Sequence, residues 1–424
     1  MIVVPFLWFL LLFVFQLKRS NGRIDIGLFI TAMFGISSLF SILGVCFHVD
    51  GFSYNISFIA TFVYCFLLTI NVLPFLWYSH LKRKIVPLSS NKPLKILAWV
   101  VLSWFIFSVS HSAMNVYEVL TGDIRALRAM VYADEMEAGW LSVLPMPIKL
   151  IVTLLNLCFG MPWVLMLLAF FSFYIQKLPL KYFLFYFISS LSGPIAGIQV
   201  ADRSATAYWI ISLIAIYIFF FRIIPQKQRK YINIFLLIIG LVMVFYLSFA
   251  TIGRFENSSS YVGQGISNIE ASIIGYLGQP FPNFCYFFDD FKPAFSNLNL
   301  LFPATAKYIF GSEMVGGVNL QEEMTLKTGI ATGAFYTYLG QIRIFCSMFV
   351  MFLFSFVYTA FTNFKLKTSK QKPLTLKSCF IYLFLSSIMW LGLFGYPYSS
   401  PTRTIAIVFS LMFIKYAMKL KIKN

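Results

Sequence analysis

Six arginines lie in or beside the stretches that interrupt the apolar runs of this chain. Arginine presents a planar fork of N–H donors that grips phosphate or carboxylate through two hydrogen bonds and stays charged when partly buried. Such residues therefore predict the binding of an anionic group, such as a phosphate ester. The six are Arg125, Arg128, Arg203, Arg254, Arg343 and Arg403.

Arg203 and Arg343 are the first choices for anion binding. Arg203 lies in a short turn between two apolar runs, and Arg343 lies about two helical turns into another apolar run. A charge at such depth in a membrane costs on the order of 3 kcal/mol and is usually paired or functional. The alternatives are a local pair with Asp202 or snorkelling for Arg203, and a structural salt bridge for Arg343.

The other four arginines have equally simple structural interpretations. Arg254 and Arg403 flank apolar runs and fit interfacial anchors as well as second-choice anion ligands. Arg125 and Arg128 are spaced i, i+3 and share one face of a predicted helix. That face fits ligand binding, or a solvated surface balanced by the acidic residues that follow it.

Carboxylates between residues 251 and 335 are candidates for a general base, which would take a proton from a hydroxyl group. We expect one of five to act in this way, although solvation explains each of them equally well. The five are Glu270, Asp289, Asp290, Glu322 and Glu323, and Glu256 and Glu313 lie in the same segment.

Other chemistries lack support in the sequence. There is no G-x-x-x-x-G-K-[ST] motif for ATP and no D-x-D pair for a metal-bound nucleotide sugar. The three histidines, His48, His80 and His111, are scattered, and the six cysteines have no C-x-x-C spacing. We therefore predict neither a metal nor another cofactor.

The composition predicts a membrane protein with many spans. The chain is 59% hydrophobic and only 11% charged, with a mean hydropathy of +0.81, far from the soluble average of about 25% charged residues. The net charge of +18 fits basic residues on the cytoplasmic side of a membrane better than a nucleic-acid partner. We expect an all-α bundle that forms one transmembrane domain over residues 1–424.

Charge distribution predicts the topology. Lys18, Arg19 and Arg23 follow the first apolar run, which puts the N-terminus outside and this end inside. Continuing along the chain gives about eleven spans with the C-terminus inside. Most of the 33 Lys and Arg residues then lie inside, whereas all of the 15 acidic residues except Asp25 lie outside.

Two outer loops stand out in this topology. The first, 117–147, contains an amphipathic segment that Asp123 could cap as a surface helix. The second, 251–335, follows a predicted span over 231–250 and is the longest segment without an apolar run of bilayer-spanning length. Arg203 follows another predicted span, over 182–200. Long loops of this kind usually carry function.

Two stretches resemble a known family. The layout, the run SGPIAGIQVADRSATAYWIISLIAIYIFF around Arg203 and the run TGAFYTYLGQ before Arg343 are similar to the Wzy family of bacterial O-antigen and capsule repeat-unit polymerases. The resemblance implies a GT-C-like fold in the bacterial inner membrane. It also implies metal-independent glycosyl transfer at the periplasmic face, between oligosaccharides carried on undecaprenyl diphosphate.

This resemblance gives the candidate residues specific roles. Arg203 and Arg343, followed by Arg254 and Arg403, would bind the diphosphate, and a loop carboxylate would take the proton from the acceptor hydroxyl. The implied partners are the lipid-linked donor and acceptor, the bilayer, a flippase and a chain-length regulator.

Three alternatives remain open. An O-antigen ligase shares the layout, but similar enzymes use a histidine in the long outer loop, and residues 251–335 contain none. A flippase or transporter of lipid-linked sugars would favour internal repeats and mid-membrane charges, which the sequence does not clearly contain. The third alternative is a non-catalytic membrane scaffold.

Overall fold

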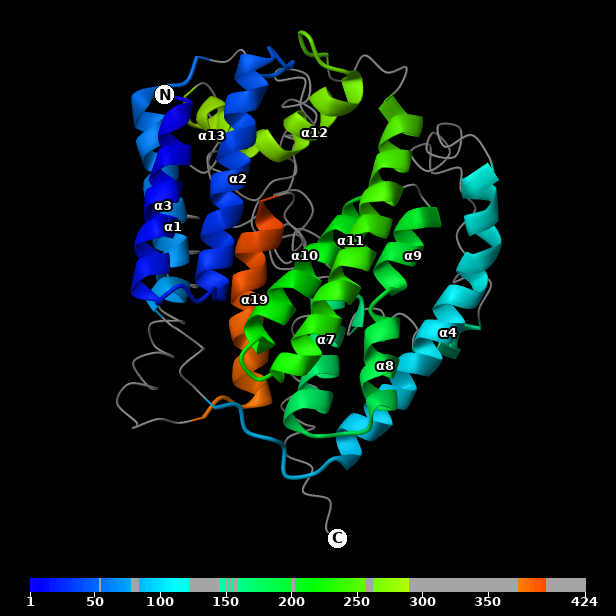
Figure 1. Ribbon diagram of the computed structural model, residues 1–424. Helices are drawn as coiled ribbons and strands as arrows, with labels where there is room; N and C mark the ends of the chain where they lie inside the picture. Colours follow the sequence, from blue (N-terminus) through cyan, green and yellow to red (C-terminus); the bar gives the residue numbers. More distant parts are fainter. Residues whose placement is uncertain are drawn as a thin grey trace. The chain divides into compact units, whose positions relative to one another are not determined.

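The computed structural model describes residues 1–52, 55–77, 84–121, 145–148, 151, 155, 159–199, 203–255, 262–289 and 373–393. These residues form twelve named α-helices and one π-helical segment (Figure 1). Among them, extended pairing is limited to an isolated bridge between Ile85 and Leu374. The predicted all-α class is confirmed for the described chain.

The helices follow one another through short turns and through the undescribed segments. In chain order they are α1 Val3–Arg19, α2 Ile26–Cys46, α3 Phe58–Trp77, α4 Lys92–Thr121, α7 Pro162–Phe170, the π-helical η3 Phe171–Ile175, α8 Leu180–Ser189, α9 Ser192–Gln199, α10 Arg203–Phe220, α11 Gln226–Phe255, α12 Asn268–Gly278, α13 Pro280–Asp289 and α19 Leu376–Gly392.

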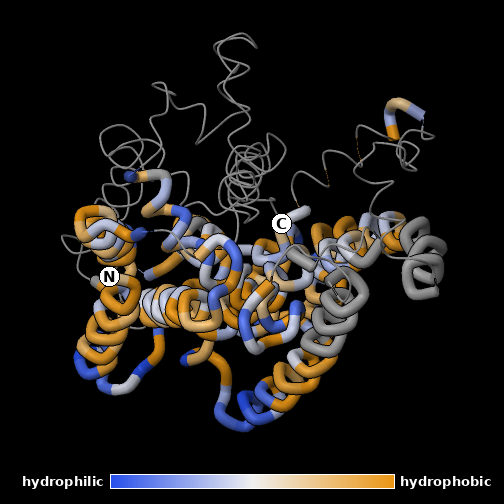
Figure 2. Tube along the Cα trace, turned by 90° about the horizontal axis from the view of Figure 1, so that it is seen from above, coloured by the Kyte–Doolittle hydropathy of each residue, from blue (hydrophilic) through white to orange (hydrophobic). Residues whose placement is uncertain are grey.

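Several of these helices are apolar along most of their length, and Figure 2 shows hydrophilic residues concentrated in the turns. In the described chain, Ile26–Cys46 and Lys92–Val109 are long and apolar enough to cross a membrane. Shorter apolar stretches lie in α3, α7 with η3, α10 and α19. Core helices of soluble proteins also pass such a test, so the number of spans remains a prediction.

The described helices belong to two compact units. The first contains α1, α2, α3, α12 and α13, and the second contains α4, α7 to α10 and nearly all of α11. Helix α19 is divided between the units, with the boundary before Tyr382.

Helix α2 is the centre of the first unit because small residues let its neighbours approach closely. Asp25 caps its start by accepting a 2.9 Å hydrogen bond from the Leu28 N–H. A Cβ atom on Gly27 would lie 2.9 Å from the backbone carbonyl of Phe75 in α3, and one on Gly44 would lie 2.5 Å from the Phe52 ring. Such close contacts are available to glycine and exclude larger residues.

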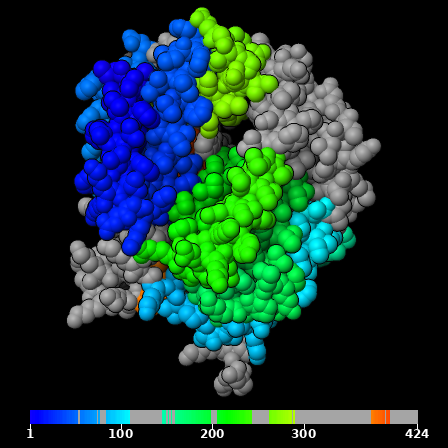
Figure 3. Space-filling view, in the orientation of Figure 1, coloured from blue at the N-terminus to red at the C-terminus, as the bar shows by residue number. Residues whose placement is uncertain are grey.

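Serine hydroxyls of α2 fasten the end of α12. Ser37 Oγ donates to the Leu277 carbonyl at 2.7 Å, and Ser41 Oγ donates to the Gly278 carbonyl at 2.6 Å. A Cβ atom on Gly278 would lie 2.7 Å from the Phe40 carbonyl carbon. Figure 3 accordingly shows the yellow-green atoms of residues 262–289 against the blue end of α2. Helix α12 is thus docked through its C-terminal carbonyls.

The second unit corrects the prediction of one continuous helix over 182–200. The structure contains two shorter helices there, α8 and α9, separated at Ser190 and Leu191. Pro194 lies in the first turn of α9, where its missing N–H is tolerated. The indole of Trp209 in α10 donates to Ser190 Oγ at 3.0 Å, so a buried contact holds the interruption in place.

The segment 251–335, predicted as a long outer loop, contains helices where it is described. Helix α11 continues to Phe255, beyond the predicted end of its span at residue 250. Ser267 and Glu270 then start α12, and Pro280 starts α13. The polar composition of this segment suggested a loop, but its described part forms short helices.

Candidate functional site

Glu270, one of the predicted bases, has a structural task at the start of α12. Its Oε2 accepts hydrogen bonds from the Ser267 N–H at 2.8 Å and the Ser267 hydroxyl at 2.9 Å, while Ser267 Oγ accepts from the Glu270 N–H. The backbone and side-chain bonds from Ser267 hold the pKa of Glu270 below its usual range. This reciprocal capping box makes Glu270 a weak base and a poor candidate for catalysis.

Asp289 has the arrangement that a base requires. It is the last residue of α13 and is half-buried, and its Oδ1 accepts a 2.8 Å hydrogen bond from Ser57 Oγ. Its Oδ2 is buried and has no hydrogen-bond partner within the described residues. One oxygen is therefore oriented and the other is buried without a partner among the described residues, which makes Asp289 the better of the two described base candidates for accepting a proton.

Arg203 is the first residue of α10, where the sequence had predicted a turn. The first N–H groups of a helix have no intrahelical partner and give this end a partial positive charge. Arginine is a cation by residue type, and the first turn of α10 contains no acidic residue, while Asp202 comes directly before the helix in the sequence. The start of α10 consequently combines two features that favour a phosphate group.

The other predicted arginines are placed less fully or not at all. Arg254 lies in the last turn of α11, where a cation stabilises the helix end by about 0.3–1 kcal/mol, so the structural interpretation suits it. The candidates that lie outside the described residues are Arg125, Arg128, Arg343, Arg403, Asp290, Glu322 and Glu323.

Sequence reasoning missed a pair of buried amides where α12 meets α13. Gln279, the C-cap of α12, is 2% exposed, and Asn283 in α13 is 1% exposed. Gln279 Oε1 and both polar atoms of the Asn283 amide lack hydrogen-bond partners within the described chain. Buried groups of this kind usually contact ordered water or a ligand. The available sequence signal was Asn283, an amide inside the aromatic run PFPNFCYFFDD.

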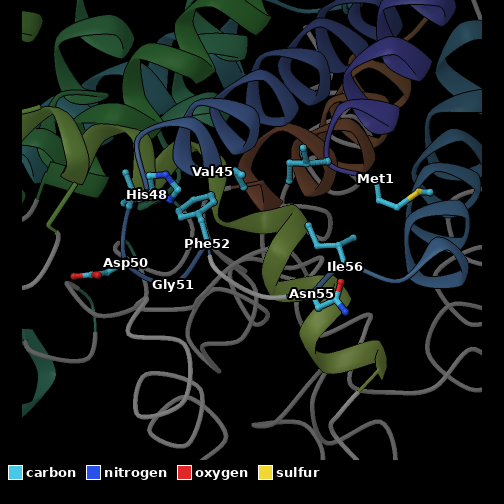
Figure 4. Close-up of a pocket in the computed structure, with 10 residues that line it drawn as sticks. Met1, Val45, His48, Asp50, Gly51, Phe52, Asn55 and Ile56 are labelled. Carbon is cyan, nitrogen blue, oxygen red and sulfur yellow. The ribbon is translucent and has the colours of Figure 1, made fainter. Parts of the chain in front are cut away.

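A pocket of about 470 Å³ lies where the start of α1, the end of α2 and the approach to α3 meet. Its polar lining residues are His48, Asp50 and Asn55, and its apolar walls include Val45, Phe52 and Ile56 (Figure 4). This volume is within the usual range for small-molecule sites. Sequence reasoning treated His48 only as one of three scattered histidines.

Within the described residues, no cluster of three or more His, Cys, Asp or Glu side chains could hold a metal ion. No protein-family model, curated protein or solved structure matches this chain. The assignment of function therefore depends on the residues themselves and on the resemblance drawn from the sequence.

Proposed function

We propose that the protein is a membrane glycosyltransferase that polymerises oligosaccharide repeat units carried on undecaprenyl diphosphate. In this proposal it is a GT-C-like bundle of about eleven spans in the bacterial inner membrane, with its N-terminus outside. The reaction takes place at the periplasmic face and builds O-antigen or capsule glycan. The observation that carries the proposal is the position of Arg203 at the start of α10, immediately after an interrupted helix.

Interrupted helices are a common way to build ligand sites in membrane proteins, transporters included, so this feature supports a ligand site and leaves the reaction to the residues around it. The break between α8 and α9 places two helix ends inside a path that hydropathy treats as one span. Arg203 and the first N–H groups of α10 would bind the diphosphate of the donor. They would stabilise the negative charge that grows on it as it leaves, so the proposal requires no metal ion for that task.

The transfer step needs a base as well as an anion site. The acceptor hydroxyl oxygen attacks the anomeric carbon of the donor, the bond from that carbon to the diphosphate oxygen breaks, and the hydroxyl proton goes to a carboxylate. Within the first unit, Asp289 is the described carboxylate whose own contacts best suit this role. Ser57 orients one of its oxygens, and the other oxygen is unpartnered among the described residues.

The helix directions in the first unit are consistent with the proposed topology. Met1, Val45 and Ile56 line one pocket, so the start of α1, the end of α2 and the approach to α3 lie together. At the opposite end of α1, Lys18 and Arg19 are its last two residues and Arg23 follows in the turn. Adjacent helices therefore alternate in direction, as the charge pattern requires.

The decisive experiment compares Arg203→Ala with Arg203→Lys in the host, with Lys227→Ala in α11 as a surface control. We expect Arg203→Ala to be produced at a normal level and to lose long glycan chains, whereas the lysine variant loses part of them because it lacks the bidentate fork. The control should give normal glycan ladders. Normal ladders from Arg203→Ala would remove this residue from the site.

Deletion of the gene distinguishes the alternatives. Single repeat units that remain attached to the outer-membrane lipid anchor would support a polymerase. Polymer that accumulates on the lipid carrier, with no glycan attached to the anchor, would identify a ligase. Repeat units that accumulate on the cytoplasmic side would identify a flippase.

A further inference from the structure

His48 lines the pocket and has a backbone conformation that is usual for glycine in this kind of turn. His48 follows the end of α2 with a φ of 46°, in the left-handed region that favours glycine. Its N–H bonds to the Val45 carbonyl at 3.2 Å, and the Val49 N–H bonds to the Gly44 carbonyl at 2.9 Å. This is the Schellman arrangement, in which glycine is the usual residue. A histidine here costs stability that glycine would not, so we look to its side chain for a role.

The imidazole of His48 is free to contact a ligand. His48 is exposed and lines the pocket, and none of the hydrogen bonds among described residues involves its side chain. The carboxylate of Asp50 turns away from it (Figure 4) and accepts a 3.3 Å bond from the Val262 N–H. The imidazole can therefore both donate and accept a hydrogen bond.

The turn that carries His48 is held firmly. The Asp50 N–H donates to the Val262 carbonyl at 3.1 Å, and the Gln264 N–H donates to the Phe47 carbonyl at 2.7 Å. Beneath it, Val49 and Phe52 form a buried cluster with Ala271 and Ile274 of α12. This support fixes the backbone from which the imidazole extends before any ligand arrives, which favours a binding site.

The lining of the pocket selects a neutral, hydroxyl-rich ligand. It contains no lysine or arginine, and the carboxylate of Asp50 is directed away from it and bonded to the Val262 N–H, so no side chain of the lining presents the donor fork that grips a diphosphate. The amide of Asn55 and the imidazole of His48 can bond hydroxyl groups, while Val45 and Ile56 offer apolar surface. A sugar ring presents both hydroxyl groups and apolar C–H faces, and the volume has room for one or two rings.

We propose that this pocket binds the saccharide portion of the acceptor, with His48 as a direct contact. The assignment rests on the proposed function, which supplies a lipid-linked oligosaccharide as the substrate. It extends that function by separating the place that recognises sugar from the arginine that binds diphosphate. His48 is then a specificity residue whose backbone strain is the cost of presenting its side chain to the ligand.

The test uses His48→Gly, with Lys177→Gly as a matched control. Lys177 also has a positive φ, of 55°, and is exposed, but it lies outside the pocket. The probe is the oligosaccharide repeat unit released from the host glycan lipid by mild acid, titrated calorimetrically into the full-length protein in detergent. Thermal unfolding is measured on the same samples.

We expect both glycine variants to unfold at the same temperature as the wild type or higher, because each relieves a strained backbone. Only His48→Gly should weaken binding, by about tenfold or more from the loss of its hydrogen bonds. Equal affinity in His48→Gly, a marked loss of stability in that variant, or no binding by the wild type would overturn the proposal.

The Arg203→Ala variant separates a failure of the proposed saccharide pocket from a failure of the proposed polymerase function. If both are right, Arg203→Ala makes no long chains yet binds the free oligosaccharide normally. Normal chains from Arg203→Ala, together with weaker binding in His48→Gly, would overturn the diphosphate site and leave the saccharide pocket standing. Loss of chains in Arg203→Ala, with unchanged binding in His48→Gly, would overturn the pocket alone.

Discussion

The hydroxyl of Ser57 donates a 2.8 Å hydrogen bond to Oδ1 of Asp289, joining residues 232 positions apart. Ser57 also accepts the Ala60 N–H at 3.0 Å and so caps the start of α3. Asp289 ends α13, where a negative charge opposes the helix dipole and costs about 0.3–1 kcal/mol. A carboxylate held in an unfavourable position, with one oxygen unpartnered among the described residues, suggests a chemical rather than a structural role.

Asp289→Asn is expected to remove catalysis while preserving the fold. The amide oxygen can still accept the Ser57 hydroxyl, but the side chain can no longer take a proton. Polymerisation by purified protein should fall by about 10² to 10⁴-fold, with an unfolding temperature equal to or above that of the wild type. Full activity in this variant would exclude Asp289 as the base.

Glu270 should show the opposite pattern. Glu270→Ala breaks the capping box and is expected to lower the unfolding temperature, while glycan chains keep their normal length. Glu270→Gln should recover most of the stability, because glutamine also serves in a capping box. The checks are thermal unfolding and a glycan ladder. A Gln variant that folds normally but makes no long chains would instead identify Glu270 as the base.

Asp25 should make stability depend on pH. Burial raises the pKa of this carboxyl from 3.8 to about 6, against the opposing hydrogen bonds from Leu28 and Gly27. The folded state thus holds the proton more tightly than the unfolded state. The resulting stabilisation is complete below about pH 4 and is lost as the pH rises through about 6.

Asp25→Asn tests this dependence because asparagine remains neutral and still caps a helix. Unfolding temperatures between pH 4 and 7 should fall for the wild type and change less for the variant. Parallel curves for the two proteins would show that Asp25 does not control the slope. Asp25→Ala should be less stable than Asp25→Asn by about 1 kcal/mol, since it loses the cap to Leu28.

Gly278→Ala should loosen α12. The new Cβ would lie 2.7 Å from the carbonyl carbon of Phe40 and 2.8 Å from the Ser41 nitrogen, atoms that cannot move without shifting α2. We expect a loss of about 1–3 kcal/mol. Gly240→Ala in α11 is the control, because nothing lies within 4 Å of its Cβ and alanine should gain about 0.5–1 kcal/mol. Destabilisation by both variants to the same extent would contradict the close contact.

Apolar runs predicted many helices well, because burial and helical hydrogen bonding both favour them. The first run predicted α1, and the run over 231–250 lies within α11. Hydropathy could not show the break between α8 and α9, because Ser190 and Leu191 do not lower the mean hydropathy of residues 182–200 enough. Pro194 was the local signal there, as Ser267 with Glu270 was for α12.

The candidate site was less predictable because tertiary contacts define it. Glu270 and Asp289 are equivalent as residue types, and only their partners separate a helix cap from an available carboxylate. The role proposed for His48 depends on a backbone angle and a pocket, neither of which a sequence pattern states. Arg203 could be singled out from the sequence because the cost of a charge in an apolar setting can be estimated there, and its role stays a prediction.

The serine contacts of α2 also impose an order on biogenesis. Ser41 reaches the Gly278 carbonyl 237 residues later in the chain, and its hydroxyl also lies 3.2 Å from the Ser37 carbonyl within its own helix. At roughly 5–20 residues per second, synthesis leaves α2 waiting on the order of 10–50 s for α12. During that interval the Ser37 carbonyl can accept the Ser41 hydroxyl, so the hydroxyl need not remain unpaired in the nascent helix.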